Sequence, residues 1–441
     1  MFLSNKTLIF AHELPKCKTM KEILKRIIFE QQENSKRLVR NAIPRHLEDE
    51  WLSTTEILII TGIRRCGKSV LLQQMRDKMD EKDFFFNFDD ERLVNFKLED
   101  FATLQECFFE LFGEQHTYYF DEIQNVAGWE TFVRRLYNEG NKVVVTGSNA
   151  RMLSRELGTH LTGRYISVEV YPFSFAEYLQ LRQIEPSQKD FYLLSGRSIL
   201  LERFRDFLEK GGFPKYLQTE SVRYLSSLYE SIVFRDVMAR NGLTNDKEIQ
   251  ELVFYLASNA TKRVTYSSLG KTIGIRHPET IKNYLEYIQQ TYIIFQLLKY
   301  APSVKTQMLS PKKVYFIDNA LVSRMGFNAT DNVGVKLENV VFIELKRRGY
   351  SLFYHADKKE CDFLVREGGR ITQAYQVTVK MEDEKTRKRE IEGLQEAMDA
   401  YQLSEGYIIT MDEQEELVVD GKAIHVVPAW EWMLKPVTLS R

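Results

Sequence analysis

Apolar residues change their spacing along the chain, and each change predicts a different kind of structure. From about residue 55 to 185, short apolar runs alternate with longer amphipathic segments, which is typical of helices packed on a parallel sheet. Tyr118-Tyr119-Phe120 and Val143-Val144-Val145 are uninterrupted apolar runs, as strands buried on both faces are. Strands are predicted at 56–61, 83–88, 117–121, 142–146 and 166–171. Helices are expected to follow Lys68, Asp100, Trp129 and Ala150.

The remaining pattern divides the chain further. From about residue 172 to 240 the strand pattern disappears and helices are predicted, with a break at Gly211-Gly212-Phe213-Pro214. Short helices are then predicted at 247–258, 266–273 and 278–290. Mixed structure returns with a helix at 337–348, strands at 351–355, 362–366 and 374–379, and a charged helix at 385–401. The predicted parts are a helical segment at 1–50, a parallel α/β core at 51–185, a helical part at 186–240, short helices with a β-like end at 241–330, and a second α/β part at 331–441.

Composition narrows the class of protein. The chain has 441 residues, 44% hydrophobic and 28% charged, with a net charge of −1, so no global field attracts it to nucleic acid or to an anionic membrane. A local patch would have to supply such contacts. The cysteines form no CxxC pair, which argues against a disulfide framework or a zinc site: Cys17, Cys66, Cys107 and Cys361.

No membrane association is expected. No apolar run reaches the ~18–20 residues that span a bilayer. Asn5 and Lys6 interrupt the apolar N-terminus, so it does not resemble a signal peptide, and Met20 is an alternative start. We therefore predict a cytoplasmic protein.

The strongest chemical signal is the segment from Gly62 to Ser69, which matches GxxxxGK[ST] between a predicted strand and an amphipathic helix. Glycines allow such a phosphate-binding loop (P-loop) to wrap around phosphate oxygens, and the helix N-terminus adds partial positive charge. Lys68 should reach the β- and γ-phosphates, and the Ser69 hydroxyl should bind Mg²⁺. ATP and Mg²⁺ are thus the predicted cofactors. The predicted nucleotide contacts are Gly62, Ile63, Arg64, Arg65, Cys66, Gly67, Lys68, Ser69 and Val70.

Polar residues at the ends of later strands are candidates for the rest of the site. Asp121 should hold Mg²⁺ and Glu122 should polarise the attacking water. Ser148 or Asn149 follows the next strand and is a candidate for contact with the γ-phosphate, although Asn149 is equally suited to cap a helix. Arg164 offers a permanently charged group for developing phosphate charge, with a surface salt bridge as the alternative.

In this order the motifs resemble the AAA+ superfamily of ATPases, and in particular bacterial and archaeal AAA-type ATP-binding proteins with a C-terminal domain of unknown function. The resemblance covers about residues 35–415 and rests on TGIRRCGKS, YYFDEIQ, VVVTGSNARML, LTGRY, YPFSFAEYL and EKGGFPKYL, then on VYFIDNAL, ENVVFIELKRRGY, KKECDFLV and KTRKREIEGL.

This resemblance implies a strand order of 5-1-4-3-2 followed by a helical lid. Asn149 then falls at sensor 1 and Arg164 at the arginine finger, with Lys215 as a weak match to sensor 2. An arginine finger acts on a neighbour's nucleotide, so the resemblance implies a homo-oligomer in the nucleotide-bound state.

Residues 241–330 are interpreted as a winged helix. Lys and Arg outnumber Asp and Glu there, so DNA is a candidate partner through Lys262, Arg263, Lys271, Arg276 and Lys282. The alternative is a joint to a protein partner, because Tyr284, Leu285, Tyr287, Ile288 and Tyr292 have the character of packing residues.

Residues 331–441 resemble a restriction-endonuclease-like α/β fold, whose sites need carboxylates for Mg²⁺ and a lysine to activate water. Glu338 and Asp362 fit the carboxylate places, but Thr378 stands where the lysine is expected, with Lys380 as a substitute on the same strand face. A degenerate domain used for binding is the favoured interpretation.

Three hypotheses follow. The first is an ATP hydrolase that couples turnover to remodelling or recognition of DNA or protein. The second is a nucleotide switch that binds ATP or ADP without turnover, and the third is an ATP-regulated, metal-dependent nuclease, against which Thr378 argues.

Overall fold

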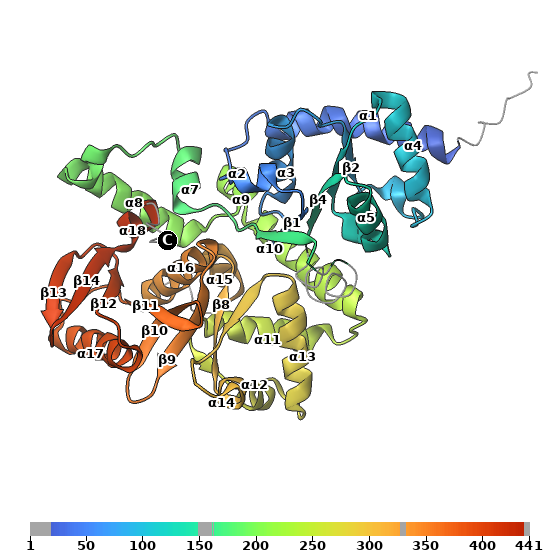
Figure 1. Cartoon of the computed structure of the whole chain (residues 1–441). Helices are drawn as coiled ribbons and strands as arrows, with labels where there is room; N and C mark the ends of the chain where they lie inside the picture. Colours follow the sequence, from blue (N-terminus) through green and yellow to red (C-terminus); the bar gives the residue numbers. More distant parts are fainter. Residues whose placement is uncertain (1–18, 149–160, 162, 327–331, 436–441) are drawn as a thin grey trace, which may run out of the picture.

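The computed structural model describes residues 19–148, 161, 163–326 and 332–435. Its first large element is a five-stranded sheet in the order β2-β3-β4-β1-β5, with every neighbouring pair parallel (Figure 1). This order confirms the predicted 5-1-4-3-2 arrangement. The strands are β1 Ile57–Thr61, β2 Phe84–Asn87, β3 Thr117–Asp121, β4 Lys142–Gly147 and β5 Tyr165–Glu169.

Helices cover both faces of this sheet, and its central strands are therefore buried along almost their whole length. Ile57 and Ile59 face one layer, formed with α1 Met20–Val39, α4 Asp100–Phe112 and α5 Trp129–Asn138. Leu58 and Ile60 face the other layer, which includes α3 Lys68–Asp77. The expected N-terminal helix thus packs as part of the sheet's own core. Shorter elements in this region are α2 Asp49–Ser53, η1 Glu91–Leu93 and η2 Ile123–Asn125.

A group of helices follows β5 and extends the α3 side of the core. Buried aromatic residues such as Phe175, Phe204 and Phe207 join them to the sheet. The last of the group, η5, is a π-helix that continues α10. The members are α7 Phe175–Leu181, η4 Gln188–Phe191, α8 Leu194–Lys210, α9 Pro214–Thr219, α10 Val222–Ser231 and η5 Ile232–Ala239.

The next segment combines helices with a small antiparallel sheet in the order β6-β8-β7. The predicted helices at 266–273 and 278–290 match the structure at both ends. In chain order the elements are α11 Asp246–Ser258, β6 Arg263–Val264, α12 Tyr266–Ile273, α13 Pro278–Gln290, β7 Ile294–Leu297, α14 Val304–Leu309, β8 Lys312–Phe316 and α15 Asn319–Met325.

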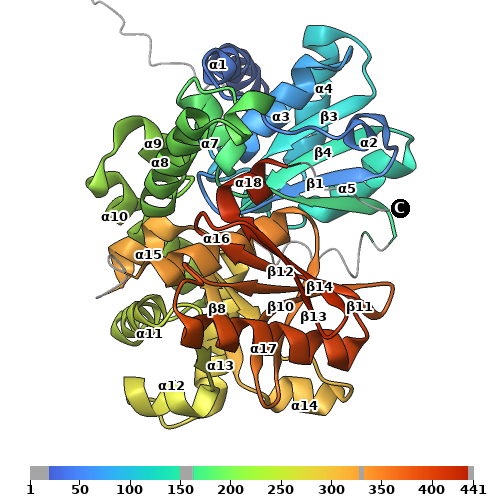
Figure 2. The same cartoon turned by 90° about the vertical axis from the view of Figure 1, so that its left-hand side faces the viewer.

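The C-terminal part is a six-stranded mixed sheet in the order β13-β14-β12-β11-β10-β9. It has α17 on one face, as Figure 2 shows, while α16 contacts β11, β9 and the neighbouring strand β8. The sequence predicted only the first half of this sheet. Its elements are α16 Val333–Arg347, β9 Ser351–Ala356, β10 Glu360–Glu367, β11 Arg370–Val377, α17 Glu384–Tyr401, β12 Glu405–Thr410, β13 Glu415–Val419, β14 Lys422–Pro428 and α18 Ala429–Leu434.

Gly62, directly after β1, is expected to tolerate no side chain. Its φ is +144° and a Cβ there would lie 2.1 Å from the carbonyl oxygen of Val170, so Gly62→Ala combines backbone strain with a clash against main chain. Gly140→Ala is the matched control, because Gly140 also has a positive φ of +84° but nothing lies within 4 Å of its Cβ position. In thermal or denaturant unfolding, the control should lose about 1–2 kcal/mol and Gly62→Ala distinctly more. Equal losses would contradict the close approach.

Candidate nucleotide-binding site

The loop from Gly62 to Gly67 joins the carboxyl end of β1 to the N-terminus of α3. Its backbone turns through positive φ at Gly62 (+144°), Arg65 (+68°) and Gly67 (+110°). Gly67 caps α3, so the first free N–H groups of that helix face the loop. A loop of this shape at a helix N-terminus is suited to bind an anion, as the motif predicts.

Lys68 lies inside the loop. Its ammonium donates to the carbonyl oxygens of Gly62 (3.1 Å) and Ile63 (3.2 Å), and it lies 3.8 Å from Glu122 Oε1. The side chain is only 3% exposed. Two of its close partners are therefore neutral carbonyls, which leaves the positive charge available to an anionic ligand.

Asp121 ends β3 beside this loop. Its carboxylate accepts hydrogen bonds from the Thr146 hydroxyl and from Asn87 Nδ2, and Ser69 is a further side-chain hydrogen-bond partner. Burial and the neighbouring charge of Glu122 raise the pKa of Asp121 to about 6. A hydroxyl and a buried carboxylate in contact are the oxygen ligands that Mg²⁺ prefers. Ser69 and Asp121 thus fit the metal role that the sequence predicts.

Glu122 follows in the left-handed conformation, with φ of 52°. Its N–H donates to the Thr146 hydroxyl oxygen and its Oε2 accepts from Gln124 Nε2 at 2.5 Å. The other amide atom of that glutamine, Oε1, is buried and has no hydrogen-bond partner among the described residues. Glu122 is therefore held beside Lys68 and next to an unsatisfied acceptor.

Arg45 is a residue of the site that sequence reasoning missed. Its guanidinium donates to the Cys66 carbonyl (3.0 Å) and the Tyr171 carbonyl (2.8 Å), and pairs with Glu177 at 2.8 Å. The side chain is 7% exposed. It therefore ties the P-loop to the segment that leads into α7. No local signal could have revealed this, because all three partners are distant in sequence.

The other predicted residues have different positions. Asn149 lies outside the described residues, whereas Ser148 is buried and its hydroxyl accepts from Gln124 Nε2 at 3.4 Å. Arg164 precedes β5, and its carbonyl accepts from the N–H of Ile57. That is the opposite end of β1 from the P-loop, so Arg164 is separated from it by the length of the strand.

The P-loop also contacts elements on either side of it. Arg64 lies 3.7 Å from Asp89, which in turn pairs with Arg235 of the π-helix at 3.1 Å. Next to Arg235, Asp236 is buried, and burial raises its pKa. Cys66 is fully buried, and burial raises the pKa of its thiol as well. Ile63 is fully buried in the core on the α3 side of the sheet, and Val70 is half-buried.

The nuclease-like carboxylates do come together, but without the expected lysine. Glu338 and Asp362 both lie within 3.1 Å of Lys313, a residue of β8. The expectation that Lys380 shares the strand face is wrong, because β11 ends at Val377 and Lys380 is exposed and pairs with Glu382 at 3.2 Å.

A parallel sheet of this order, with a P-loop after β1 and an Asp-Glu pair after β3, defines a P-loop protein of the AAA+ superfamily. Residues 54–179 match the family model described as an AAA domain. Residues 201–332 and 333–432 match two domains of unknown function, DUF8612 and DUF4143.

The chain belongs to the same family as the uncharacterized protein MJ1544 of Methanocaldococcus jannaschii, to which it is 34% identical over 403 residues, or 87% of this chain and 89% of that protein. An uncharacterized protein of Haemophilus influenzae is 30% identical over 403 residues, covering 88% and 96% of the two chains. Neither name states an activity.

Solved structures give only weak likenesses. Cdc6p from Pyrobaculum aerophilum is 12% identical with a TM-score of 0.23, over 71% of this chain and 94% of that one. PCH-2 of C. elegans is 13% identical with a TM-score of 0.23, over 60% and 68% of the two chains. TM-scores this low carry no argument about function. In the ranges that the structure describes, every helix is too short or too polar to cross a membrane.

Replacing Arg45 should loosen the P-loop. Arg45→Met removes two hydrogen bonds to carbonyls and leaves Glu177 without its ion partner, so we expect a loss of about 3–5 kcal/mol in unfolding free energy and ATP binding weaker by on the order of tenfold. Calorimetric titration and denaturant unfolding measure both.

Arg45→Lys keeps the charge but not the planar fork, and should recover only part of the loss. Arg37→Met, on the exposed face of α1, is the control and should change stability by less than about 0.5 kcal/mol. Wild-type affinity in Arg45→Met would show that the loop does not depend on this residue.

Proposed function

We propose that this protein binds ATP with Mg²⁺ at the P-loop and hydrolyses it. The observation that carries this proposal is the meeting of Lys68, the Ser69–Asp121 pair and Glu122 at one edge of the sheet. Each part has one role in phosphoryl transfer, and the β2-β3-β4-β1-β5 order brings all of them to the same place.

The roles follow from the chemistry of each side chain. Lys68 exchanges its loop carbonyls for phosphate oxygens and offsets their charge. Ser69 and Asp121 would hold Mg²⁺, which would supply positive charge to offset the charge that develops on the phosphates. Glu122 accepts a hydrogen bond from the attacking water and orients it. Gln124 Nε2 donates to Glu122 Oε2 and would hold that carboxylate in the orientation that the water requires.

Side-chain contacts connect the region around the P-loop to the C-terminal parts of the chain. The hydroxyl of Tyr292, which follows α13, donates to Thr61 at the end of β1 over 2.9 Å. Arg347 of α16 donates to the carbonyl of Pro172 at 3.0 Å and lies over the Tyr171 ring. Since Tyr171 also binds Arg45, movement of the P-loop would be felt by both α13 and α16. We infer that hydrolysis is coupled to a change in how these parts meet a partner.

A protein partner fits the C-terminal parts better than DNA. The segment 246–316 has the helix and sheet order of a winged helix, in which α13 would be the recognition helix. Its exposed positions include Glu279, Lys282 and Glu286, and Lys282 pairs with Glu279. The outer face of α13 therefore carries no excess of positive charge. Of the other basic residues, Arg263 pairs with Glu360 at 3.4 Å.

Two variants separate binding from turnover. Lys68→Ala should abolish ATP binding measured by calorimetry, because it removes the charge at the centre of the loop. Glu122→Gln should bind ATP as the wild type does and release phosphate about 10²–10⁴-fold more slowly.

Glu405→Gln, an exposed carboxylate change far from the P-loop, is the matched control and should leave both measurements unchanged. A wild type that binds ATP but releases no phosphate over a wide range of protein concentration would favour a non-hydrolysing switch. ATP binding unchanged in Lys68→Ala would reject the site itself.

We propose further that Arg164 acts on the nucleotide of a neighbouring copy. Arg164 directly precedes β5 and lies beside the start of β1, whereas the P-loop follows the end of β1. The five residues of β1 separate the two by about 15 Å. Arg164→Ala should therefore lower phosphate release by about 10³-fold or more. Mixing Arg164→Ala, which has an intact P-loop, with Lys68→Ala, which has an intact Arg164, should restore activity. No recovery on mixing, together with a monomer in ATP by light scattering, would contradict action between copies.

A further inference from the structure

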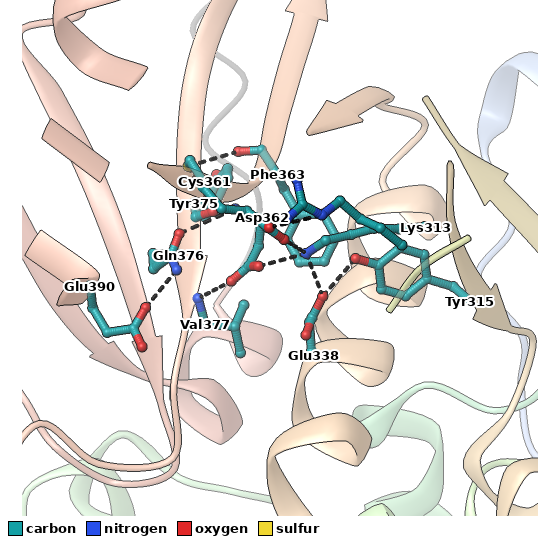
Figure 3. Close-up of polar contacts among 12 residues, drawn as sticks. Lys313, Tyr315, Glu338, Cys361, Asp362, Phe363, Tyr375, Gln376, Val377 and Glu390 are labelled. Atoms are coloured by element: carbon teal, nitrogen blue, oxygen red, sulfur yellow. Dashed lines mark hydrogen bonds and ion pairs between the residues drawn. The ribbon is translucent and has the colours of Figure 1, made fainter. Parts of the chain in front are cut away.

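Lys313 lies in the middle of a pocket of carboxylates where β8 meets the C-terminal sheet. Figure 3 shows its ammonium directed between Asp362 and Glu338. The nitrogen lies 2.8 Å from Asp362 Oδ1, 3.1 Å from Glu338 Oε1 and 2.7 Å from Glu360 Oε1. The ammonium donates hydrogen bonds to Asp362 and Glu338 and forms an ion pair with Glu360.

These groups come from different parts of the fold. Lys313 is on the middle strand of the small antiparallel sheet, Glu338 is on α16, and Asp362 and Glu360 are on β10. Burial alone would lower the pKa of the Lys313 ammonium, but the charges of Asp362 and the other carboxylates outweigh it and raise the pKa well above its usual value. The side chain is 3% exposed and remains charged.

Further contacts hold the lysine in place. Tyr315, two residues along the same strand, donates to Glu338 at 2.7 Å and stacks on Phe342 with ring centroids 4.1 Å apart. Asn339 makes two hydrogen bonds with the backbone of Phe316. Strand β8 is thus fixed against α16 on both sides of the pocket.

Residues of the C-terminal sheet also form hydrogen bonds with Asp362. The second oxygen of Asp362 accepts from the N–H of Val377 at 2.9 Å, and Gln376 links Asp362 to Glu390. Arg389 in turn pairs with Glu390. Among the residues that the structure describes, no group of three His, Cys, Asp or Glu side chains is arranged to hold a metal ion.

We propose that the Lys313 ammonium is the permanent cation of this pocket and stands where a nuclease-like site would hold its divalent metal. The C-terminal sheet is then metal-independent, and the ion cluster serves as a fixed joint between residues 263–316 and 333–428. The three carboxylate oxygens lie 2.7–3.1 Å from the Lys313 nitrogen, which are hydrogen-bond distances. Bonds from oxygen to Mg²⁺ are about 2.0–2.1 Å long. A metal could enter only if Lys313 left. This proposal is independent of ATP hydrolysis.

The test compares the metal response of unfolding in nucleotide-free protein. The melting temperature of the wild type should be the same in EDTA and in millimolar Mn²⁺ or Mg²⁺. Lys313→Met should lower it by about 5 °C or more in EDTA, because three carboxylates lose their cation. Mn²⁺ should then restore part of the loss.

Two further variants make the result specific. In Lys313→Met combined with Asp362→Asn, Mn²⁺ should restore nothing, because a ligand is gone. Lys312→Met is the matched control: Lys312 is also buried, but its ammonium donates to the carbonyls of Met308 and Ser310, so its loss should create no response to Mn²⁺.

Two outcomes would overturn the proposal. One is a wild-type melting temperature in Lys313→Met. The other is that nucleotide-free wild type binds Mn²⁺ in calorimetry and that Asp362→Asn removes this binding. This measurement does not need Lys313→Met, so it tests the proposal even if that variant does not fold.

Discussion

Burial of β1 on both faces, between two parallel neighbours, is the constraint on which the candidate site depends. Leu58 and Ile60 pack on one layer of helices and Ile57 and Ile59 on the other, so a shift by one residue would exchange the two sets. The register places Thr61 beside Gly147 of β4 and Glu169 of β5. The P-loop therefore begins beside the carboxyl ends of β3 and β4, where Asp121 and Glu122 lie.

The same constraint explains how far the site could be predicted from the sequence. Uninterrupted apolar strands and a glycine-bearing motif are local signals, so the positions of the strands and the candidates Lys68, Ser69 and Asp121 followed from them, whereas the strand order came from the resemblance to AAA+ ATPases. Arg45 could not be predicted, because a single arginine in a connector gives no indication that its partners lie at residues 66, 171 and 177. The strands after residue 402 were missed although they are at least as long as β1, and β13 has no fully buried position that would mark it as an apolar run.

The C-terminal half shows the same limit more strongly. Thr378 argues against a nuclease, because the missing lysine is visible in the sequence. Nothing in the sequence indicated that Lys313 would lie between Glu338 and Asp362, because Lys312-Lys313 looks like an ordinary basic pair. One of these two lysines caps backbone carbonyls and the other neutralises carboxylates from two later elements. Adjacent residues on a strand point to opposite faces, and only the fold shows what each face meets.

Lys68 and Lys313 are equally buried, at 3% exposed each, yet their surroundings give them opposite capacities. Lys68 donates to two neutral carbonyls and stands 3.8 Å from its carboxylate, so an arriving phosphate can replace weak partners at little electrostatic cost. Lys313 is surrounded by three carboxylates within 3.1 Å, so an anion there would be repelled. Burial alone therefore does not mark a lysine as functional. What distinguishes a ligand-binding lysine from a structural one is whether its charge has already been neutralised by the fold.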